Sequence, residues 1–269
     1  MIKVGLTLRN MGTQSTAPIM RDAVLGIEEM GFESVWITDH IAIPPDDAEG
    51  SGGRYTDPMT TLAWLGGLTT RINVGVGVLV VPYRPGLPLA KQIATVQELT
   101  DGRLLVGAAV GWMDAEFRAL GLDRHQRGKM TDDTLELLKD CFADDVVVRN
   151  DQPFLFKPRP PMPPVYIGGS APHALKRAVR FGHGWLPMAR NLERLEADMA
   201  SFREIATAAG KQPGPVTVMT GATPDEVADR VGTLEGMGVE RVVLSVRYDT
   251  ASEYLDATGE LAARLELSA

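Results

Sequence analysis

The 269-residue chain has one cysteine, Cys141, and only four histidines. A single cysteine cannot form an internal disulfide, and the sequence contains no paired spacing of the kind that metal ligands follow. Cys141 lies in an apolar helical run, which favours a packed thiol over a nucleophile. The sequence therefore predicts neither a disulfide framework nor a metal site.

The chain also lacks an excess of positive charge. Its 27 Lys and Arg residues face 35 Asp and Glu residues, a formal net charge of −8. That balance argues against nucleic acid or an anionic membrane as the main partner, although a local basic pocket remains compatible with it. No apolar run approaches membrane-spanning length, and no cationic region followed by an apolar stretch marks a signal peptide. We expect a soluble, cytoplasmic protein.

What the chain does have is an ordinary apolar fraction of 44% and a regular alternation of short buried strands with helices. Eight strand-then-helix units predict an α/β fold, a (β/α)8 TIM barrel, in a single domain over residues 1–269. An open doubly wound sheet is the alternative, but the first strand lacks a Gly-rich dinucleotide turn. The expected strands are residues 3–8, 34–37, 72–81, 104–110, 165–167, 184–187, 216–219 and 241–246.

Three segments are expected to be long loops: residues 40–56, the polar insertion 112–127 and the proline-rich excursion 151–164. Long loops in compact domains often bind ligands or act as lids. At the carboxyl ends of barrel strands such loops meet at one face, where ligands bind. We therefore expect these three loops to build the pocket for a small-molecule substrate.

Asp39 and His40 end the second expected strand, which places an acid and an imidazole at that face. Histidine exchanges a proton near neutral pH, and an adjacent acid can orient it. The alternative is that Asp39 caps a turn and His40 packs against the barrel rim. Within the third strand, Gly75 and Gly77 indicate a bulge or a close ligand, or else a tight barrel interior.

Two further turns follow expected strands. Gly168, Gly169 and Ser170 lie between a strand and a helix, where free backbone N–H groups and a hydroxyl suit a phosphate. The alternative is a tight turn without a ligand. Gly111 and Trp112 end the fourth strand, where the indole either flanks a flat ring or packs under the insertion.

Other basic and imidazole side chains are weaker candidates. Arg54, Arg84 and Lys91 could supply positive charge to an anionic ligand, although surface basic residues are usually solvated. For His125, His173 and His183, solvated or packed roles are the ordinary expectation.

Taken in order, these segments resemble the luciferase-like monooxygenase superfamily and, within it, the actinobacterial type of coenzyme F420-dependent oxidoreductase. The resemblance covers nearly the whole chain, and the ordered combination is more specific than any single motif. The matching segments are residues 31–40, 70–84, 89–92, 101–104, 111–121, 164–170 and 181–185.

The resemblance implies a TIM barrel, usually a homodimer, with the deazaflavin in the barrel mouth. It implies that Asp39 contacts the cofactor and that His40, near the reacting carbon, acts in proton transfer. It also implies a non-prolyl cis peptide between Gly77 and Val78, which makes a bulge behind the deazaflavin ring.

By the same resemblance the turn of Gly168, Gly169 and Ser170 approaches the cofactor phosphate. We also expect Gly111 and Trp112 in the cofactor site, because of their place at the end of the fourth strand. The sugar-phosphate dehydrogenases of this group have a glutamate near the position of Trp112, so glucose 6-phosphate oxidation is not expected.

The sequence thus predicts an oxidoreductase that passes hydride between coenzyme F420 and a small organic substrate. One alternative is an FMN-dependent monooxygenase that uses reduced flavin and oxygen. Another, of a different class, is a barrel that binds flavin or deazaflavin without turnover. His183 replaces the aspartate usual in its turn, and the sequence offers no interpretation of this.

Overall fold

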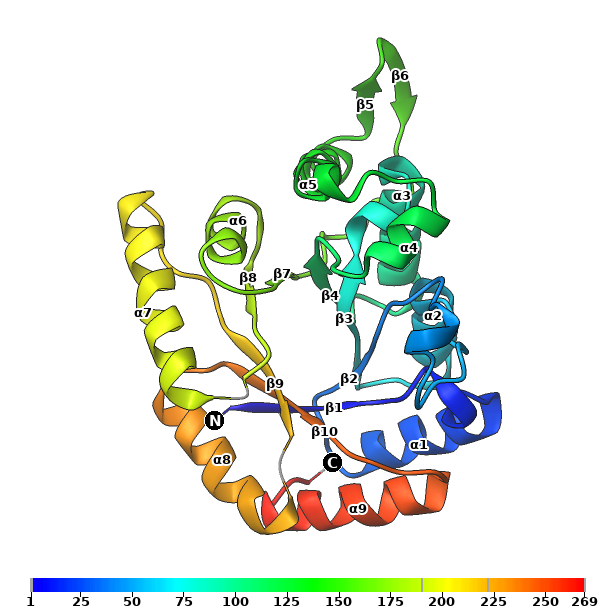
Figure 1. Cartoon of the computed structure of the whole chain (residues 1–269), viewed down its shortest axis with the longest axis vertical. Coiled ribbons are helices and arrows are strands. Elements are labelled where there is room, and N and C mark those ends of the chain that lie inside the picture. The colour runs from blue at the N-terminus through cyan, green and yellow to red at the C-terminus, as the bar shows by residue number, and fades with distance from the viewer. Residues whose placement is uncertain (1, 190, 222, 269) are drawn as a thin grey trace.

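The computed structural model describes residues 2–189, 191–221 and 223–268. Eight parallel strands pair in the order β8-β7-β4-β3-β2-β1-β10-β9. Isolated bridges from Trp185 to Val216 and from Met188 to Met219 join the two end strands, so the sheet closes into a barrel. The predicted (β/α)8 TIM barrel is confirmed (Figure 1). The barrel strands are β1 (Lys3–Thr7), β2 (Ser34–Ile37), β3 (Asn73–Val80), β4 (Leu104–Ala109), β7 (Val165–Gly168), β8 (Gly184–Leu186), β9 (Thr217–Gly221) and β10 (Arg241–Ser245).

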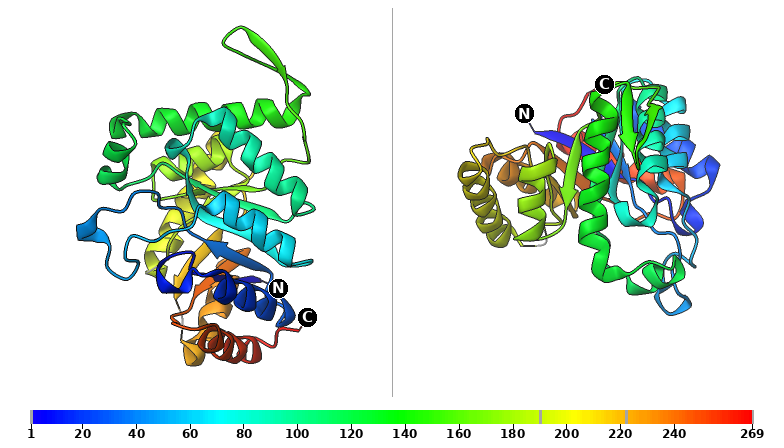
Figure 2. Two further views of the ribbon diagram at one scale, coloured as in Figure 1. Left: turned by 90° about the vertical axis from the view of Figure 1, so that its right-hand side faces the viewer. Right: turned by 90° about the horizontal axis from the view of Figure 1, so that it is seen from above.

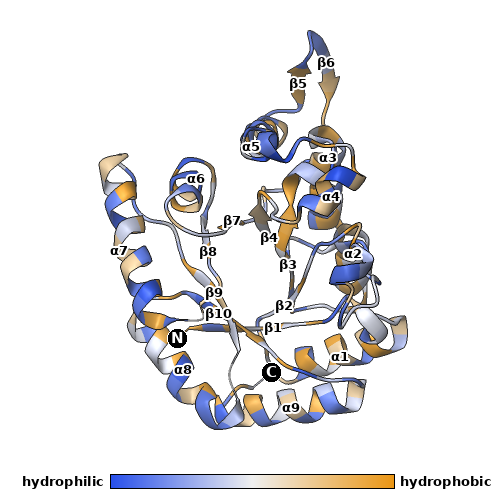
Figure 3. Cartoon of the chain, viewed as in Figure 1, coloured by the Kyte–Doolittle hydropathy of each residue, from blue (hydrophilic) through white to orange (hydrophobic). Residues whose placement is uncertain are grey.

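Helices surround the strands in all three views (Figures 1 and 2). Their starts follow local signals: the Asp57 carboxylate caps α2 by accepting a hydrogen bond from Thr60 N, and Thr223 and Glu226 form a capping box on α8. The helices carry both hydrophobic and hydrophilic positions (Figure 3), as expected when one face packs on a sheet. They are α1 (Ala17–Glu29), α2 (Pro58–Leu68), α3 (Gly86–Leu99), α4 (Asp114–Ala119), α5 (Arg127–Ala143), α6 (His173–Phe181), α7 (Leu192–Ala208), α8 (Pro224–Gly236) and α9 (Ala251–Arg264).

The barrel interior is filled by large side chains that need glycine opposite them. Trp36 is fully buried and donates from Nε1 to Ser34 Oγ at 2.8 Å. A Cβ on Gly75 would lie 2.7 Å from the Trp36 ring, closer than side chains pack. The glycine at position 75 therefore makes room for an indole, which is the tight-interior alternative, and not for a ligand. The other buried side chains of this interior cluster are Leu105, Tyr166, Leu186, Met219 and Val243.

The predicted bulge in β3 is present. The pairing of β3 with β4 shifts register between Val76 and Leu79, and the peptide bond from Gly77 to Val78 is cis. The Val78 side chain packs against the interior cluster, and a Cβ on Gly168 would lie 2.5 Å from its Cγ1. Gly168 is thus required for β7 to lie against the bulge.

Two segments expected to be irregular contain regular structure. The insertion 112–127 includes α4, whose Phe117 is fully buried against Val80 and Tyr83. The chain before and within the proline-rich excursion forms an antiparallel hairpin of β5 (Val146–Arg149) and β6 (Gln152–Leu155), which projects from the barrel (Figure 1). Asn150 and Asp151 both have positive φ, the geometry of a two-residue hairpin turn.

Within the described ranges, no helix has both the length and the apolar character needed to cross a bilayer.

Candidate active site

His40 follows β2 at the carboxyl-terminal face of the barrel, and its ring is held by a residue far along the chain. Nδ1 of His40 lies 2.9 Å from Oε2 of Glu116 on α4. The expectation that the neighbouring Asp39 orients the imidazole is therefore wrong, because Glu116 performs that function. Nε2 of His40 makes no hydrogen bond to any residue that the structure describes.

Glu116 is fully buried but has hydrogen-bond donors on both carboxylate oxygens. Oε1 accepts from the backbone N–H groups of Ile41, at 2.6 Å, and Ala42, at 3.0 Å, while Oε2 accepts from Tyr83 Oη at 2.8 Å. Burial alone would raise the pKa of Glu116, but these bonds and the one to His40 outweigh it and lower the pKa. A charged Glu116 can only accept a hydrogen bond, so Nδ1 of His40 is the donor of this pair and Nε2 is the nitrogen left for a ligand.

Asp39 is buried and its carboxylate is also fully engaged. Arg84 donates to both oxygens, at 2.7 and 3.0 Å, and Val80 N donates at 2.9 Å. Arg84 also donates to Asp57 at 2.8 Å. Burial would lower the pKa of Arg84, but the two carboxylates raise it. This ion-pair chain fixes the end of β3 against the end of β2, and contact between Asp39 and a cofactor stays a prediction.

Trp112 lies beside His40, and its indole is exposed to solvent. The side chain is 67% exposed, and its ring meets the His40 ring edge-on at 6.3 Å between centroids. Tyr55, from the loop after β2, lies 5.0 Å from His40 on the same measure. Gly111 has φ +78°, and a Cβ there would lie 2.6 Å from Val80, so only glycine fits this turn. An exposed indole beside an imidazole can flank a flat ring.

The glycine turn after β7 offers donors to an anion. Gly169 has φ +117°, and both Gly169 and Ser170 are exposed. Their backbone N–H groups and the Ser170 hydroxyl donate to no atom of the described residues, whereas the carbonyl of Gly169 accepts from Trp185 Nε1 at 2.9 Å. Unused donors at an exposed turn that precedes a helix fit the phosphate of a flavin or deazaflavin.

The three basic candidates are already engaged in the fold. Arg84 holds Asp39, Arg54 donates to Ser15, and Lys91 donates to the carbonyl of Lys157. Each of the three therefore already has a partner within the fold.

The remaining histidines lie apart from this constellation. His183 accepts a hydrogen bond at Nδ1 from the backbone N–H of Val165, at the start of β7, and burial lowers its pKa. Because Nδ1 must be unprotonated to accept, His183 is a neutral structural residue. His125 and His173 are exposed.

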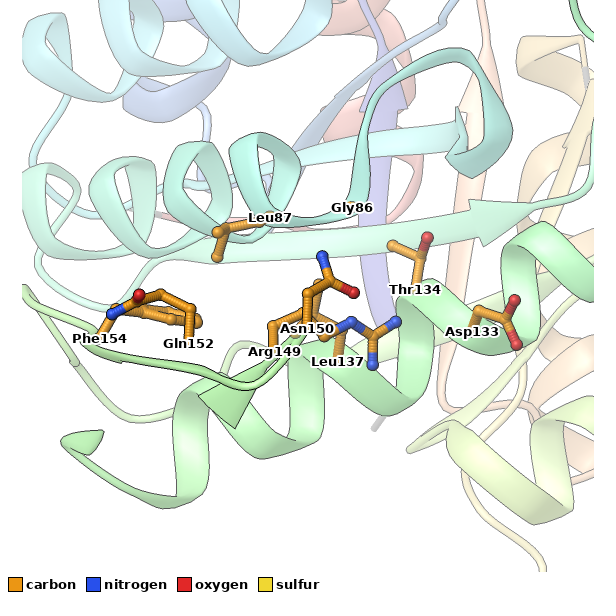
Figure 4. Close-up of a pocket in the computed structure, with 9 residues that line it drawn as sticks. All are labelled: Gly86, Leu87, Asp133, Thr134, Leu137, Arg149, Asn150, Gln152 and Phe154. Carbon is orange, nitrogen blue, oxygen red and sulfur yellow. The ribbon is translucent and has the colours of Figure 1, made fainter. Parts of the chain in front are cut away.

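A cavity of about 430 Å³ lies away from His40 (Figure 4). Its lining comes from α3, α5 and the β5–β6 hairpin, with no residue of the eight barrel strands. Leu87, Leu137 and Phe154 supply its apolar walls, and its one acidic residue, Asp133, is paired with Lys129. The cavity therefore has no acid–base pair comparable to His40 and Glu116.

Relatives of the chain include proteins that use either type of cofactor. An uncharacterised protein of Mycobacterium tuberculosis is 26% identical over 238 residues, 82% of each chain. An F420-dependent hydroxymycolic acid dehydrogenase of the same organism is 29% identical over 197 residues, 69% of this chain and 53% of that protein. An FMNH2-dependent dimethylsulfone monooxygenase of Pseudomonas putida is 29% identical over 153 residues, 53% of this chain and 42% of that protein.

Solved structures share the fold over almost the full length. A monooxygenase from Streptomyces bottropensis superimposes with a TM-score of 0.81 at 20% identity, covering 98% of this chain and 99% of that one. An F420-dependent secondary alcohol dehydrogenase, solved with an F420–acetone adduct, gives 0.78 at 15% identity with the same coverage. The sequence profile of the luciferase-like monooxygenases matches residues 6–224. The relatives of this chain thus include an F420-dependent and an FMNH2-dependent oxidoreductase. The chain belongs to the luciferase-like monooxygenase family.

Proposed function

We propose that the chain is a coenzyme F420-dependent oxidoreductase that acts on a small organic substrate in the barrel mouth. The observation that carries the proposal is His40, whose Nδ1 is held by buried Glu116 while Nε2 has no partner among the described residues. An imidazole positioned in this way is suited to exchange one proton with a bound substrate.

A bound deazaflavin supplies the transfer of a hydride, and the protein supplies the proton that accompanies it. In the direction of alcohol oxidation, His40 Nε2 takes the hydroxyl proton of the substrate. The resulting imidazolium is stabilised by the Glu116 carboxylate, which Ile41 N and Ala42 N keep charged. In the reverse direction the same nitrogen returns the proton to the carbonyl oxygen.

The residues that would hold the cofactor are those whose donors are unused or whose rings are exposed. Gly169 and Ser170 would bind its phosphate, Trp112 would flank its ring, and Gly77 and Val78 would lie behind the ring. The F420-dependent relative aligns with a larger share of this chain than the FMN-dependent one, 69% against 53%, which supports the choice of cofactor.

A fluorescence titration of the purified apo-protein with F420 and, separately, with FMN tests the proposal. Tight binding of F420 alone supports it and justifies a substrate screen with oxidised and reduced F420. Preference for FMN replaces it with the second candidate, an oxygen-using monooxygenase. The Pseudomonas relative favours this candidate, because it is 29% identical, as is the F420-dependent relative. Tight cofactor binding with no turnover in any screen would instead favour a carrier or sensor.

Ser170→Ala examines the phosphate turn directly. Loss of one hydroxyl donor to a charged oxygen should weaken cofactor binding about ten-fold. Ser201→Ala on α7 is the matched control, because the Ser201 hydroxyl bonds only within its own helix. Equal affinities in the two variants would remove Ser170 from the cofactor site.

A further inference from the structure

A crevice lies across the barrel mouth from His40, at the carboxyl ends of β8, β9 and β10. Two recesses, of about 310 and 400 Å³, adjoin there and share Gly221 and Ser245 in their lining. In the closed sheet β8, β9 and β10 lie four, three and two strands from β2, so the crevice extends from the opposite side of the mouth toward β1. Nothing in the cofactor assignment above uses these residues.

Arginines without partners distinguish this crevice. Arg230 of α8 lines the first recess and Arg247, two residues after β10, lines the second. In the part of the chain that the structure describes, neither guanidinium makes a hydrogen bond or an ion pair. Arg84, across the mouth, has two carboxylate partners.

The remaining polar lining favours an anion. Ser245 contributes a hydroxyl without a partner among the described residues, whereas the Thr220 hydroxyl donates to the carbonyl of Ala189 at 3.0 Å. The lining has one acid, Glu226, which accepts a hydrogen bond from the Thr223 hydroxyl at 3.0 Å within the α8 capping box. Two unpaired positive charges against one engaged negative charge leave the crevice basic, in a chain whose net charge is −8.

The crevice borders the expected position of the cofactor ring. Met188 and Met219 form an apolar wall of its first recess. The Met219 sulfur lies 2.9 Å from where a Cβ on Gly77 would be, so the wall touches the bulge of β3. A ligand anchored at Arg230 can therefore extend over two methionines toward the centre of the mouth.

We propose that this crevice binds an oxyanion, a carboxylate or a phosphate ester, on the substrate of the enzyme. Arg230 is the main anchor, with Arg247 and the Ser245 hydroxyl around it, because charge-assisted bonds from a guanidinium are the strongest available to an oxyanion. The two recesses have the size of a small-molecule pocket. The assignment of the oxyanion to the substrate rests on the proposed function, which places the cofactor phosphate at Gly169 and Ser170.

Isothermal titration of the full chain with inorganic phosphate and, separately, with succinate tests the crevice without any cofactor. Wild-type protein should saturate with at least one of them, and phosphate alone or succinate alone identifies the class of oxyanion. Arg230→Gln should weaken that binding about ten-fold or more, because a bond to a charged group is lost. Arg194→Gln, an exposed arginine on α7, should bind as the wild type does.

Oxyanion binding at the crevice would be excluded if neither anion saturated the wild type, or if Arg230→Gln bound the anion as tightly as the wild type. A second titration, with F420 and FMN, separates this proposal from the first. Unchanged cofactor affinity in Arg230→Gln assigns the crevice to the substrate, whereas a parallel loss assigns it to the cofactor and overturns the proposal. Binding of neither cofactor, with phosphate binding still dependent on Arg230, overturns the cofactor and leaves the oxyanion site standing.

Discussion

The two sides of the barrel mouth use charge in opposite ways. Beside β2 and β3 the two buried carboxylates have partners: Asp39 with Arg84, and Glu116 with His40, Tyr83 and two backbone N–H groups. Beside β9 and β10, Arg230 and Arg247 have none among the described residues. Partnered groups are held in one geometry before any ligand arrives, whereas unpartnered ones gain their bonds from the ligand. Under the two proposals the first side, called the catalytic side below, performs the chemistry, and the second recognises the substrate.

His40→Ala should have the largest effect, and it should abolish proton transfer without changing the crevice at β8, β9 and β10. Turnover should fall about 100- to 10,000-fold, the contribution of a positioned acid–base group, while cofactor affinity is retained. Steady-state kinetics with the identified substrate, beside a cofactor titration, provides the measurement. His125→Ala, which removes an exposed imidazole, is the control, and unchanged turnover in His40→Ala would exclude the proton-transfer role.

A pair of arginine substitutions sharpens the comparison most directly. Arg84→Met should destabilise the fold by about 3–5 kcal/mol, because it leaves the Asp39 carboxylate buried without its cation. Arg230→Met should change the free energy of unfolding by less than about 0.5 kcal/mol, since no contact of its charge is lost. Chemical denaturation of both variants and the wild type measures the difference. Similar losses in the two variants would mean that Arg230 is also a structural residue.

The stability of the catalytic side should depend on pH through Glu116. The folded-state pKa of Glu116 is lowered from 4.5, so its stabilising contribution is full above that value and is lost as pH falls through the lower folded pKa. Between about pH 5 and pH 3 the wild type should lose more stability than Glu116→Gln, which cannot titrate. Glu98→Gln, an exposed position on α3, should follow the wild type. Parallel pH curves for wild type and Glu116→Gln would show that Glu116 is not held charged.

Much of the fold could be predicted from local sequence. The eight strands are short apolar runs, and helix starts such as Asp57 before Pro58 follow local capping rules. The hairpin at residues 146–155 was missed because its strands carry exposed Val146, Val148 and Leu155, an apolar run without the alternation of a half-buried strand. The α4 helix was missed because six residues with two acids and an arginine read as a polar loop.

The site divides in the same way. His40 and Trp112 could be found because strand ends mark the mouth, which is a rule about position along the chain. Glu116 could not, because it meets His40 across 76 positions and only the packing of α4 brings them together. The available signal was Phe117: an aromatic residue in a polar segment indicates a buried helix face, and hence a buried neighbour. Arg230 gave no signal, because a basic residue on an amphipathic helix is ordinarily solvated.

Trp112→Ala should have the smallest effect and tests whether the exposed indole belongs to the catalytic side. Because Trp112 is 67% exposed, its loss should change the free energy of unfolding by less than about 0.5 kcal/mol. Loss of an aromatic contact worth about 1 kcal/mol should weaken cofactor binding roughly five-fold. Trp64→Ala, which removes a 36% exposed indole from α2 outside the barrel, should leave cofactor affinity unchanged. If both tryptophan variants bind the cofactor like the wild type, Trp112 does not flank the ring, and the fixed part of the catalytic side is limited to His40, Glu116 and the groups that hold them.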